Sequence, residues 1–395
     1  MRPVPPPVSA LPAPTSADSR PTAVVYCEGN FARIDGKTAN GLVRSSERYR
    51  IVAVIDSTID GADAGLALGD VAAGIPVVDS LAAALAVATP GPLDSLESLA
   101  APVPSPMPDV FIFGLAPLSG LMSPADRAAV IEAIGAGLDI VSGLHEFLED
   151  DPEISAHARK AGVTLHDIRR PRPTRDLRMF DGAIDGVDCL RIAILGTDGA
   201  IGKRTTATLL TSALKAAGVH AVMVGTGQTG LMQGAKYGVA LDAIPAQFGV
   251  GELEGAVVSA WEGERPQVIV VEGQGALSHP AYLSSTVVLR ASRPQAVILQ
   301  HAPGRTVLSD YPDVAMPQAA DELALIELFG RTRVIGLAIN HENMQHSEVA
   351  AAAALYEFEL GIPAADPLWD GADRLADMVL QAYPALVPEG EKVAT

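Results

Sequence analysis

The residues best suited to chemistry lie between positions 192 and 206, where the sequence reads IAILGTDGAIGKRTT. An apolar strand is expected to run into a glycine-containing turn, and a helix is expected to begin near Lys203. Small residues let backbone amides curl around an anion, the helix N-terminus adds positive potential, and the lysine adds a charge. This pattern predicts a phosphate-binding loop.

The loop departs from the usual G-x-x-x-x-G-K-[ST] pattern at two positions. Thr197 stands where the first glycine is expected, and Arg204 stands where a magnesium-binding hydroxyl usually follows the lysine. Thr205, or failing that Thr206, would supply that hydroxyl. An ordinary turn between a strand and a helix is the alternative interpretation. The loop residues predicted to hold cofactor phosphates are Gly196, Thr197, Asp198, Gly199, Gly202, Lys203, Arg204, Thr205 and Thr206.

A carboxylate is expected beside this loop. Residues 268–275 read as an apolar strand that ends in Glu272 and a glycine turn. At the carboxyl edge of a parallel sheet, Glu272 would lie near the phosphate loop. It could help to hold magnesium or act as a general base. The alternative is a strand-ending carboxylate that caps the next turn.

Two further glycine-containing segments accompany strands. Gln228 and Thr229 lie in the first and suit a substrate carboxylate or a phosphate. Asn340 ends the last long strand and could read an adenine edge. Residues 340–343 do not form Asn-Lys-x-Asp, so the sequence does not support guanine specificity.

Two histidines are predicted at the same sheet edge, where ligands bind in open α/β folds. His279 follows the turn after Glu272, and His301 follows the next strand. Either could carry a proton near neutral pH, whereas the alternative is a ring nitrogen that caps a turn. Arg305 could clamp a carboxylate or phosphate through two parallel hydrogen bonds.

Composition excludes several classes of protein. The chain has 395 residues, with 28 Lys and Arg against 47 Asp and Glu and a net charge of −19, which argues against broad binding to nucleic acid or anionic membranes. Two cysteines exclude a disulfide scaffold and a Cys-rich zinc site. The N-terminus has no apolar signal-peptide core, and no apolar run reaches the ~20 residues of a membrane helix. We expect a cytoplasmic protein that acts on a small molecule, and a homo-oligomer from base rates alone.

The elements that position these residues can be predicted from the sequence pattern. Short apolar runs alternate with helical patterns, which predicts an α/β fold with parallel sheets. In the first half, strands are expected over 23–27, 51–55, 110–114, 138–141 and 163–167. In the second half, strands are expected over 190–195, 221–224, 268–271, 296–299 and 334–339. A helix is predicted over 125–136, with Ser123 as its cap and Pro124 at its start.

This alternation divides into two domains. We predict a Pro-rich tail over 1–21, a Rossmann-like domain over 22–168 with a Pro-rich insertion over 88–108, and an Arg- and Pro-rich linker over 169–189. A P-loop NTPase-like α/β domain is predicted over 190–386, and a short tail over 387–395.

With these motifs the chain resembles the DUF1611 family, which joins a Rossmann-like N-terminal domain to a P-loop domain. The matching motifs lie at 37–44, 109–120, 142–145, 196–206, 225–230, 272–282 and 301–305. One branch of that family acetylates D-glutamate with acetyl-CoA, so the resemblance implies an N-acetyltransferase. The P-loop domain is also similar to dethiobiotin synthetase, which implies ATP and magnesium as the alternative cofactors.

Three functions therefore remain open. In an N-acetyltransferase the loop would bind phosphates of acetyl-CoA, Glu272 or His279 would take the amine proton, and the substrate contacts would be Gln228, Thr229, His301 and Arg305. In an ATP-dependent ligase or kinase, Lys203 would hold phosphate oxygens while Thr205 and Glu272 organised magnesium. The third possibility is a regulator that senses a nucleotide without catalysis.

Overall fold

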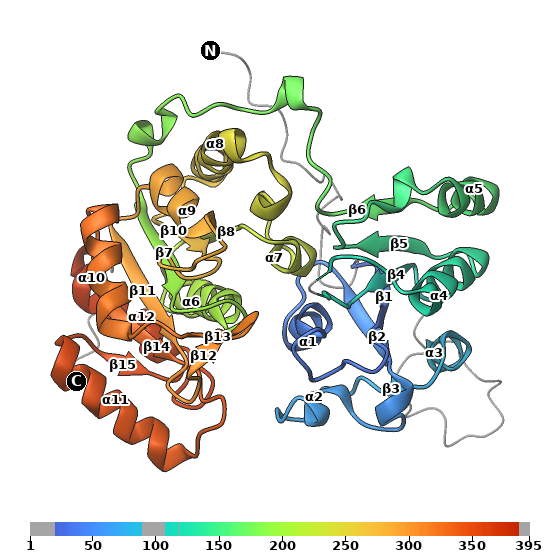
Figure 1. Ribbon diagram of the computed structural model, residues 1–395, viewed down its shortest axis with the longest axis horizontal. Helices are drawn as coiled ribbons and strands as arrows, with labels where there is room; N and C mark the ends of the chain where they lie inside the picture. The colour runs from blue at the N-terminus through green and yellow to red at the C-terminus, as the bar shows by residue number, and fades with distance from the viewer. Residues whose placement is uncertain (1–19, 89–106, 118, 387–395) are drawn as a thin grey trace. The chain divides into compact units, whose positions relative to one another are not determined.

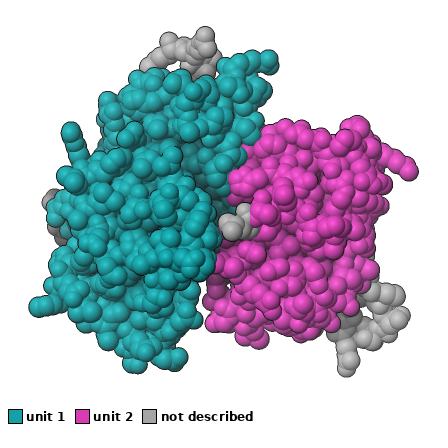
Figure 2. Space-filling model, in the orientation of Figure 1, with its two compact units in different colours: residues 1–8, 171–230, 235–395 teal, residues 9–170, 231–234 magenta. Residues whose placement is uncertain are grey.

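The computed structural model describes residues 20–88, 107–117 and 119–386. Residues 1–19 of the predicted N-terminal tail, the predicted C-terminal tail and most of the Pro-rich insertion lie outside these residues. The chain divides into two compact units (Figure 2). Among the described residues, unit 1 comprises 171–230 and 235–386, and unit 2 comprises 20–170 and 231–234.

Unit 2 contains a six-stranded parallel sheet in the order β3-β2-β1-β4-β5-β6 (Figure 1). Its strands are β1 (Thr22–Tyr26), β2 (Arg50–Ile55), β3 (Val77–Val78), β4 (Val110–Phe113), β5 (Asp139–Ser142) and β6 (Leu165–Asp167). Its helices are α1 (Lys37–Arg44), α2 (Ala64–Ala67), α3 (Leu81–Ala88), α4 (Pro124–Gly135) and α5 (Pro152–Ala161). This strand order is that of a Rossmann-like sheet, as predicted.

Helix α4 begins at Pro124, directly after the predicted cap Ser123. The Ser123 hydroxyl accepts the amide hydrogen of Asp126, whose carboxylate in turn accepts the amide hydrogen of Ser123. This capping box satisfies amides at the start of the helix, and Pro124 occupies the first turn, where its missing N–H does no harm. The predicted cap is confirmed.

Unit 1 contains a seven-stranded parallel sheet in the order β15-β14-β11-β7-β10-β8-β9, plus an antiparallel hairpin of β12 and β13. Its strands are β7 (Leu190–Gly196), β8 (Ala221–Gly225), β9 (Tyr237–Gly238), β10 (Val268–Glu272), β11 (Ala296–His301), β12 (Val307–Leu308), β13 (Tyr311–Ala315), β14 (Arg333–Ile339) and β15 (Ala364–Ala365). Its helices are α6 (Lys203–Ala216), α8 (Ala246–Glu264), α9 (Ser284–Ser292), α10 (Ala319–Gly330), α11 (His346–Leu360) and α12 (Asp373–Ala382). Helix α7 (Gln228–Gln233) crosses the boundary between the units.

Both faces of the unit 1 sheet are covered, because side chains alternate along each strand. On β7, Ile192 and Ile194 pack into the core formed with α6 and α12. Ala193 and Leu195 point to the opposite core, which α8, α9, α10 and α11 complete (Figure 1). A strand buried on both faces reads as a continuous apolar run, which is why the sequence shows it clearly.

The segment after the unit boundary differs from the linker predicted over 169–189. From residue 171 onward it belongs to unit 1, and Leu177, Ile184 and Val187 lie in the core of that unit. Glu252 on α8 accepts hydrogen bonds from the Arg172 guanidinium (2.5 Å) and from the amide of Arg178 (2.6 Å). The Arg- and Pro-rich composition suggested an interdomain linker, but hydrogen bonds to the buried carboxylate of Glu252 on α8 attach this segment to unit 1.

Candidate functional site

The phosphate loop connects β7 to α6 at the carboxyl edge of the unit 1 sheet. Helix α6 begins at Lys203 as predicted, directly after Gly202, whose φ of 101° requires glycine. The amides of the first turn of a helix have no partners within the helix, so they face an incoming anion. The loop therefore has the backbone geometry of an anion site.

Lys203 is 5% exposed, and its ammonium donates a hydrogen bond to the backbone carbonyl of Asp198. Burial lowers the pKa of Lys203 to about 8, although the carboxylates of Asp198 and Glu272 act in the opposite direction. A negative charge bound beside this ammonium would favour its charged form, so the position suits an anion.

Two side chains that the sequence analysis assigned to ligands, Arg305 and Asn340, hold the loop in place. Arg305 Nη1 donates to Asp198 Oδ2 (2.8 Å) and to the carbonyl of Gly199 (3.0 Å). Asn340 Nδ2 donates to the carbonyl of Ile201 (2.9 Å). Because these polar groups bind the loop itself, the predicted contacts of Arg305 with a substrate and of Asn340 with an adenine stay untested predictions.

His301 is engaged in the same way. Its Nδ1 lies 2.9 Å from the hydroxyl of Thr197, and its ring meets Tyr356 edge-on. Burial lowers the pKa of His301 to about 4, so the ring is neutral at physiological pH. This environment suits a structural histidine, and the predicted contact of His301 with substrate remains untested.

Glu272 ends β10 and is 5% exposed. Its Oε2 accepts hydrogen bonds from the amides of Thr226 (2.8 Å) and Gly227 (3.3 Å). Burial raises the pKa of Glu272, and the positive charges of Arg204 and Lys203 oppose that rise. The structure thus brings Glu272 into electrostatic reach of the loop, as the sequence predicted.

The amides that hold Glu272 directly precede α7, where the buried side chains of Gln228 and Thr229 begin the helix. Gln274, two residues beyond Glu272, donates to the Thr226 hydroxyl (2.7 Å). The turn after β8 and the turn after β10 are therefore joined by hydrogen bonds. Gln228 and Thr229 start at the same edge as the carboxylate, as expected.

His279 lies in the loop that follows Glu272 and is 6% exposed. Its Nδ1 accepts hydrogen bonds from the amides of Ala281 (3.1 Å) and Tyr282 (3.3 Å). Its ring stacks on that of Tyr282 with centroids 4.3 Å apart, and Tyr311 meets it edge-on at 5.6 Å. The charges of Asp198 and Lys203, which lie between β7 and the first turn of α6, act on the ring electrostatically.

Sequence reasoning missed the side chains that position this histidine. Glu322 on α10 accepts hydrogen bonds from the amides of Leu277 and Ser278 and from the Ser278 hydroxyl (2.6 Å). Asp310, in the β12–β13 turn, accepts a hydrogen bond from Tyr282 Oη (2.7 Å). Neither acid belongs to a local motif, and only the folded chain brings it to the His279 loop.

The predicted magnesium ligands have different environments. The Thr206 hydroxyl donates to Gln300 Oε1 (2.5 Å) and is buried, whereas Thr205 is half-buried. Of the two, Thr205 is the better placed to meet an ion. Within the described ranges, no group of three or more His, Cys, Asp or Glu side chains could hold a metal ion, and no helix is long and apolar enough to cross a membrane.

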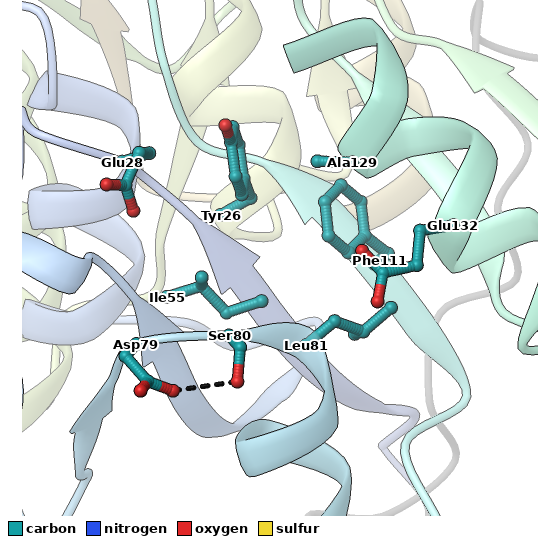
Figure 3. Close-up of a pocket in the computed structure, with 9 residues that line it drawn as sticks. All are labelled: Tyr26, Glu28, Ile55, Asp79, Ser80, Leu81, Phe111, Ala129 and Glu132. Atoms are coloured by element: carbon teal, nitrogen blue, oxygen red, sulfur yellow. Dashed lines mark hydrogen bonds between the residues drawn. The ribbon is translucent and has the colours of Figure 1, made fainter. Parts of the chain in front are cut away.

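Unit 2 has a cavity of about 190 Å³ at its own sheet (Figure 3). Tyr26 and Phe111 form part of its wall, and the carboxylates of Glu28, Asp79 and Glu132 line it. No lysine, arginine or histidine is among its lining residues. A cavity of this charge disfavours phosphate.

Comparisons with known proteins match both halves of the chain. A family model described as a domain of unknown function (DUF1611_C), P-loop domain, matches residues 178–376. The corresponding N-terminal model, described as a Rossmann-like domain, matches residues 57–171. These matches confirm the predicted α/β architecture and both domain types.

Relatives and a solved structure agree with the family models. The D-glutamate N-acetyltransferase of Tritonibacter scottomollicae is 32% identical over 273 residues, which cover 67% of this chain and 79% of that protein. The D-glutamate N-acetyltransferase of a Pseudoalteromonas species is 28% identical over 271 residues, with the same coverage of 67% and 79%. The crystal structure of a DUF1611 family protein from Anabaena variabilis superposes with a TM-score of 0.79 and 30% identity, and covers 92% of this chain and 100% of that one.

Proposed function

This chain belongs to the DUF1611 family, and we propose that it is an N-acetyltransferase that transfers the acetyl group of acetyl-CoA to an amino acid, with D-glutamate as the first candidate. The names of two relatives support the reaction class and the acceptor. The observation that carries the proposal is the buried Lys203 at the start of α6, with a buried carboxylate, Glu272, in its electrostatic reach.

The phosphate loop fits the phosphates of CoA. Lys203 and the first-turn amides of α6 would hold them, since both present positive charge at one edge of the sheet. No hydrolysis is needed for this role, so the displaced hydroxyl at Arg204 is no obstacle. A fixed phosphate would anchor the co-substrate while its thioester end reached the acceptor.

Glu272 is the residue that we assign to proton removal. The transfer forms a bond between the amine nitrogen and the carbonyl carbon, breaks the C–S bond, and moves a proton from the amine to the departing thiolate. A carboxylate whose pKa is raised by burial is better matched to an amine proton at neutral pH than an exposed one. Gln228 and Thr229 remain the predicted contacts for the carboxylates of the acceptor.

Calorimetric titration with acetyl-CoA and, separately, with ATP and Mg²⁺ tests this proposal. We expect acetyl-CoA to bind the unaltered protein and the exposed control Lys215→Met, and to bind Lys203→Met much more weakly. Acetylation of D-glutamate by the unaltered protein should then be detectable by release of the CoA thiol. Magnesium-dependent binding of ATP without binding of acetyl-CoA would instead favour the ligase or kinase alternative.

Two further predictions belong with this proposal. A cytoplasmic location suits an enzyme that draws on acetyl-CoA, and a homo-oligomer is the base-rate expectation for an acidic α/β enzyme. Fractionation and light scattering would test them.

A further inference from the structure

The imidazole nitrogen Nε2 of His279 is buried. It has no hydrogen-bond partner in the described part of the chain. Burial of a polar atom without a partner costs free energy, so such an atom calls for an explanation. An atom of a bound ligand is the explanation that suits a ring on which the charges of Asp198 and Lys203 in the phosphate loop act.

The hydrogen bonds of the other ring nitrogen, Nδ1, determine whether Nε2 carries a proton. Nδ1 accepts hydrogen bonds from the amides of Ala281 and Tyr282, and therefore presents a lone pair. A neutral imidazole carries one proton, which must then reside on Nε2. A ring turned by half a rotation would place a carbon against the two amides and lose both bonds.

The surroundings hold the ring in this orientation. Tyr282 stacks on one face with an interplanar angle of 16°, and its hydroxyl is tied to Asp310. Tyr311 closes on the ring edge-on, and Glu322 anchors the two residues that precede His279. A side chain held from several elements is preorganised to act on a ligand at a fixed position.

The charge on the ring follows from its neighbours. Burial lowers the pKa of His279, and the ammonium of Lys203 acts in the same direction. The carboxylates of Asp198 and Asp310 act in the opposite direction but do not overcome burial. The ring is therefore neutral at physiological pH, with its proton on Nε2.

We propose that His279 acts as a neutral hydrogen-bond donor, whose Nε2–H holds the thioester carbonyl oxygen and the oxyanion that develops on it during acetyl transfer. This inference rests on the proposed function. During attack by the amine, the carbonyl oxygen gains negative charge while Nε2–H keeps its proton. Collapse of that intermediate breaks the C–S bond and returns the electron pair to the carbonyl. The imidazole neither gains nor loses a proton, so proton transfer is left to Glu272.

Two substitutions separate this role from that of a base. His279→Phe keeps a ring that can stack on Tyr282 but removes the donor, and should lower kcat by about 10²–10³-fold with little change in acetyl-CoA binding. His279→Gln restores an N–H donor without a basic nitrogen, and should recover part of the lost rate. His220→Gln, at a half-exposed histidine, is the matched control and should leave kcat unchanged.

Nitrogen NMR of labelled histidine gives a readout that needs no turnover. We expect the resonances that disappear in His279→Phe to report a neutral ring protonated at Nε2 near neutral pH, and the Nε2–H signal to shift when acetyl-CoA is added. A ring protonated at Nδ1, or a charged ring at neutral pH, would overturn the inference. Thermal unfolding and acetyl-CoA titration establish that each variant is folded.

The outcomes for the two proposals differ. Full activity in His279→Phe, or none in a folded His279→Gln that binds acetyl-CoA, would overturn the donor role and leave the acetyltransferase proposal standing. An unaltered protein that neither binds acetyl-CoA nor acetylates any amino acid would overturn both, even with the Nε2–H tautomer seen by NMR.

Discussion

Asp198 and Arg305 form a nearly buried ion pair, with Arg305 Nη1 2.8 Å from Asp198 Oδ2, that ties the phosphate loop to the segment after β11. The same guanidinium reaches Glu342 after β14, and the amide of Ser309 donates to Asp198 (2.8 Å). The loop is thus fixed by residues that lie more than 100 positions away in the sequence. The shape of the phosphate loop depends on tertiary contacts as much as on the local motif.

Arg305→Ala should destabilise the protein because it leaves the carboxylate of Asp198 buried without its partner. Loss of one member of a buried pair costs about 3–5 kcal/mol in the free energy of unfolding, measurable by denaturant titration. Arg293→Ala, which removes the exposed ion pair with Asp185, is the control and should cost less than about 1 kcal/mol. If Arg305→Ala raised only the KM for the acceptor and left stability intact, Arg305 would be the substrate clamp that its sequence suggested.

Lys203 should give the stability of the protein a distinct dependence on pH. The ordinary pKa of lysine is 10.5, and the folded protein lowers that of Lys203 to about 8. Between these two pH values the unfolded chain binds more protons than the folded one, so the free energy of unfolding rises as pH rises. Below about 8 the residue is charged in both states, and its contribution no longer changes with pH.

The measurement compares denaturant titrations of the unaltered protein and of Lys203→Met across that range. The unaltered protein should gain stability with increasing pH relative to the variant. Lys215→Met, at an exposed position on the same helix, should follow the unaltered protein. Parallel curves for all three proteins would contradict a lowered pKa for Lys203.

The long elements of the fold could be predicted from the sequence, because buried strands and helices form recognisable apolar patterns. Each strand expected at the core of the two sheets is present within a few residues of its predicted ends, and α6 begins at the predicted residue. The short strands β3, β9 and β15 have two residues each, too few for an apolar pattern to stand out. The hairpin strand β13 is exposed along its whole length and shows no buried face.

The site residues could be predicted only where a polar or charged side chain lies at the end of a strand or in the segment that follows it. Glu272 ends β10, and Lys203 and His279 lie in the segments that follow β7 and β10. The charge of Glu272 acts on Lys203, and the charge of Lys203 acts on His279. Asp310 and Glu322 could not be predicted in this way, because each contacts the His279 loop from an element later in the chain. A sequence shows that a polar side chain ends a strand, but whether its partner is a ligand or a carbonyl of the neighbouring loop depends on the packed structure.

Gly273→Ala should destabilise the central pair of strands. A Cβ at this position would lie 1.9 Å from the carbonyl oxygen of Ile194 on β7, so β10 and β7 would have to separate. Overpacking of this kind costs about 1–3 kcal/mol, which thermal unfolding would detect. Gly135→Ala is the control, because a Cβ there meets nothing within 4 Å and the helix gains stability from alanine. An equal effect of the two substitutions would contradict the close approach of the strands.

Glu272→Gln should separate proton removal from binding. The amide side chain can still accept hydrogen bonds from Thr226 and Gly227, so the fold and acetyl-CoA binding should persist. It cannot take a proton, and kcat should fall by about 10²–10⁴-fold.

In the unaltered protein, kcat should decline as pH falls through the raised pKa of Glu272, because only the ionised carboxylate is a base. Glu264→Gln, at a partly exposed carboxylate paired with Lys236, should leave both the rate and its pH profile unchanged. A Glu272→Gln variant with full activity would show that the amine proton leaves by another route.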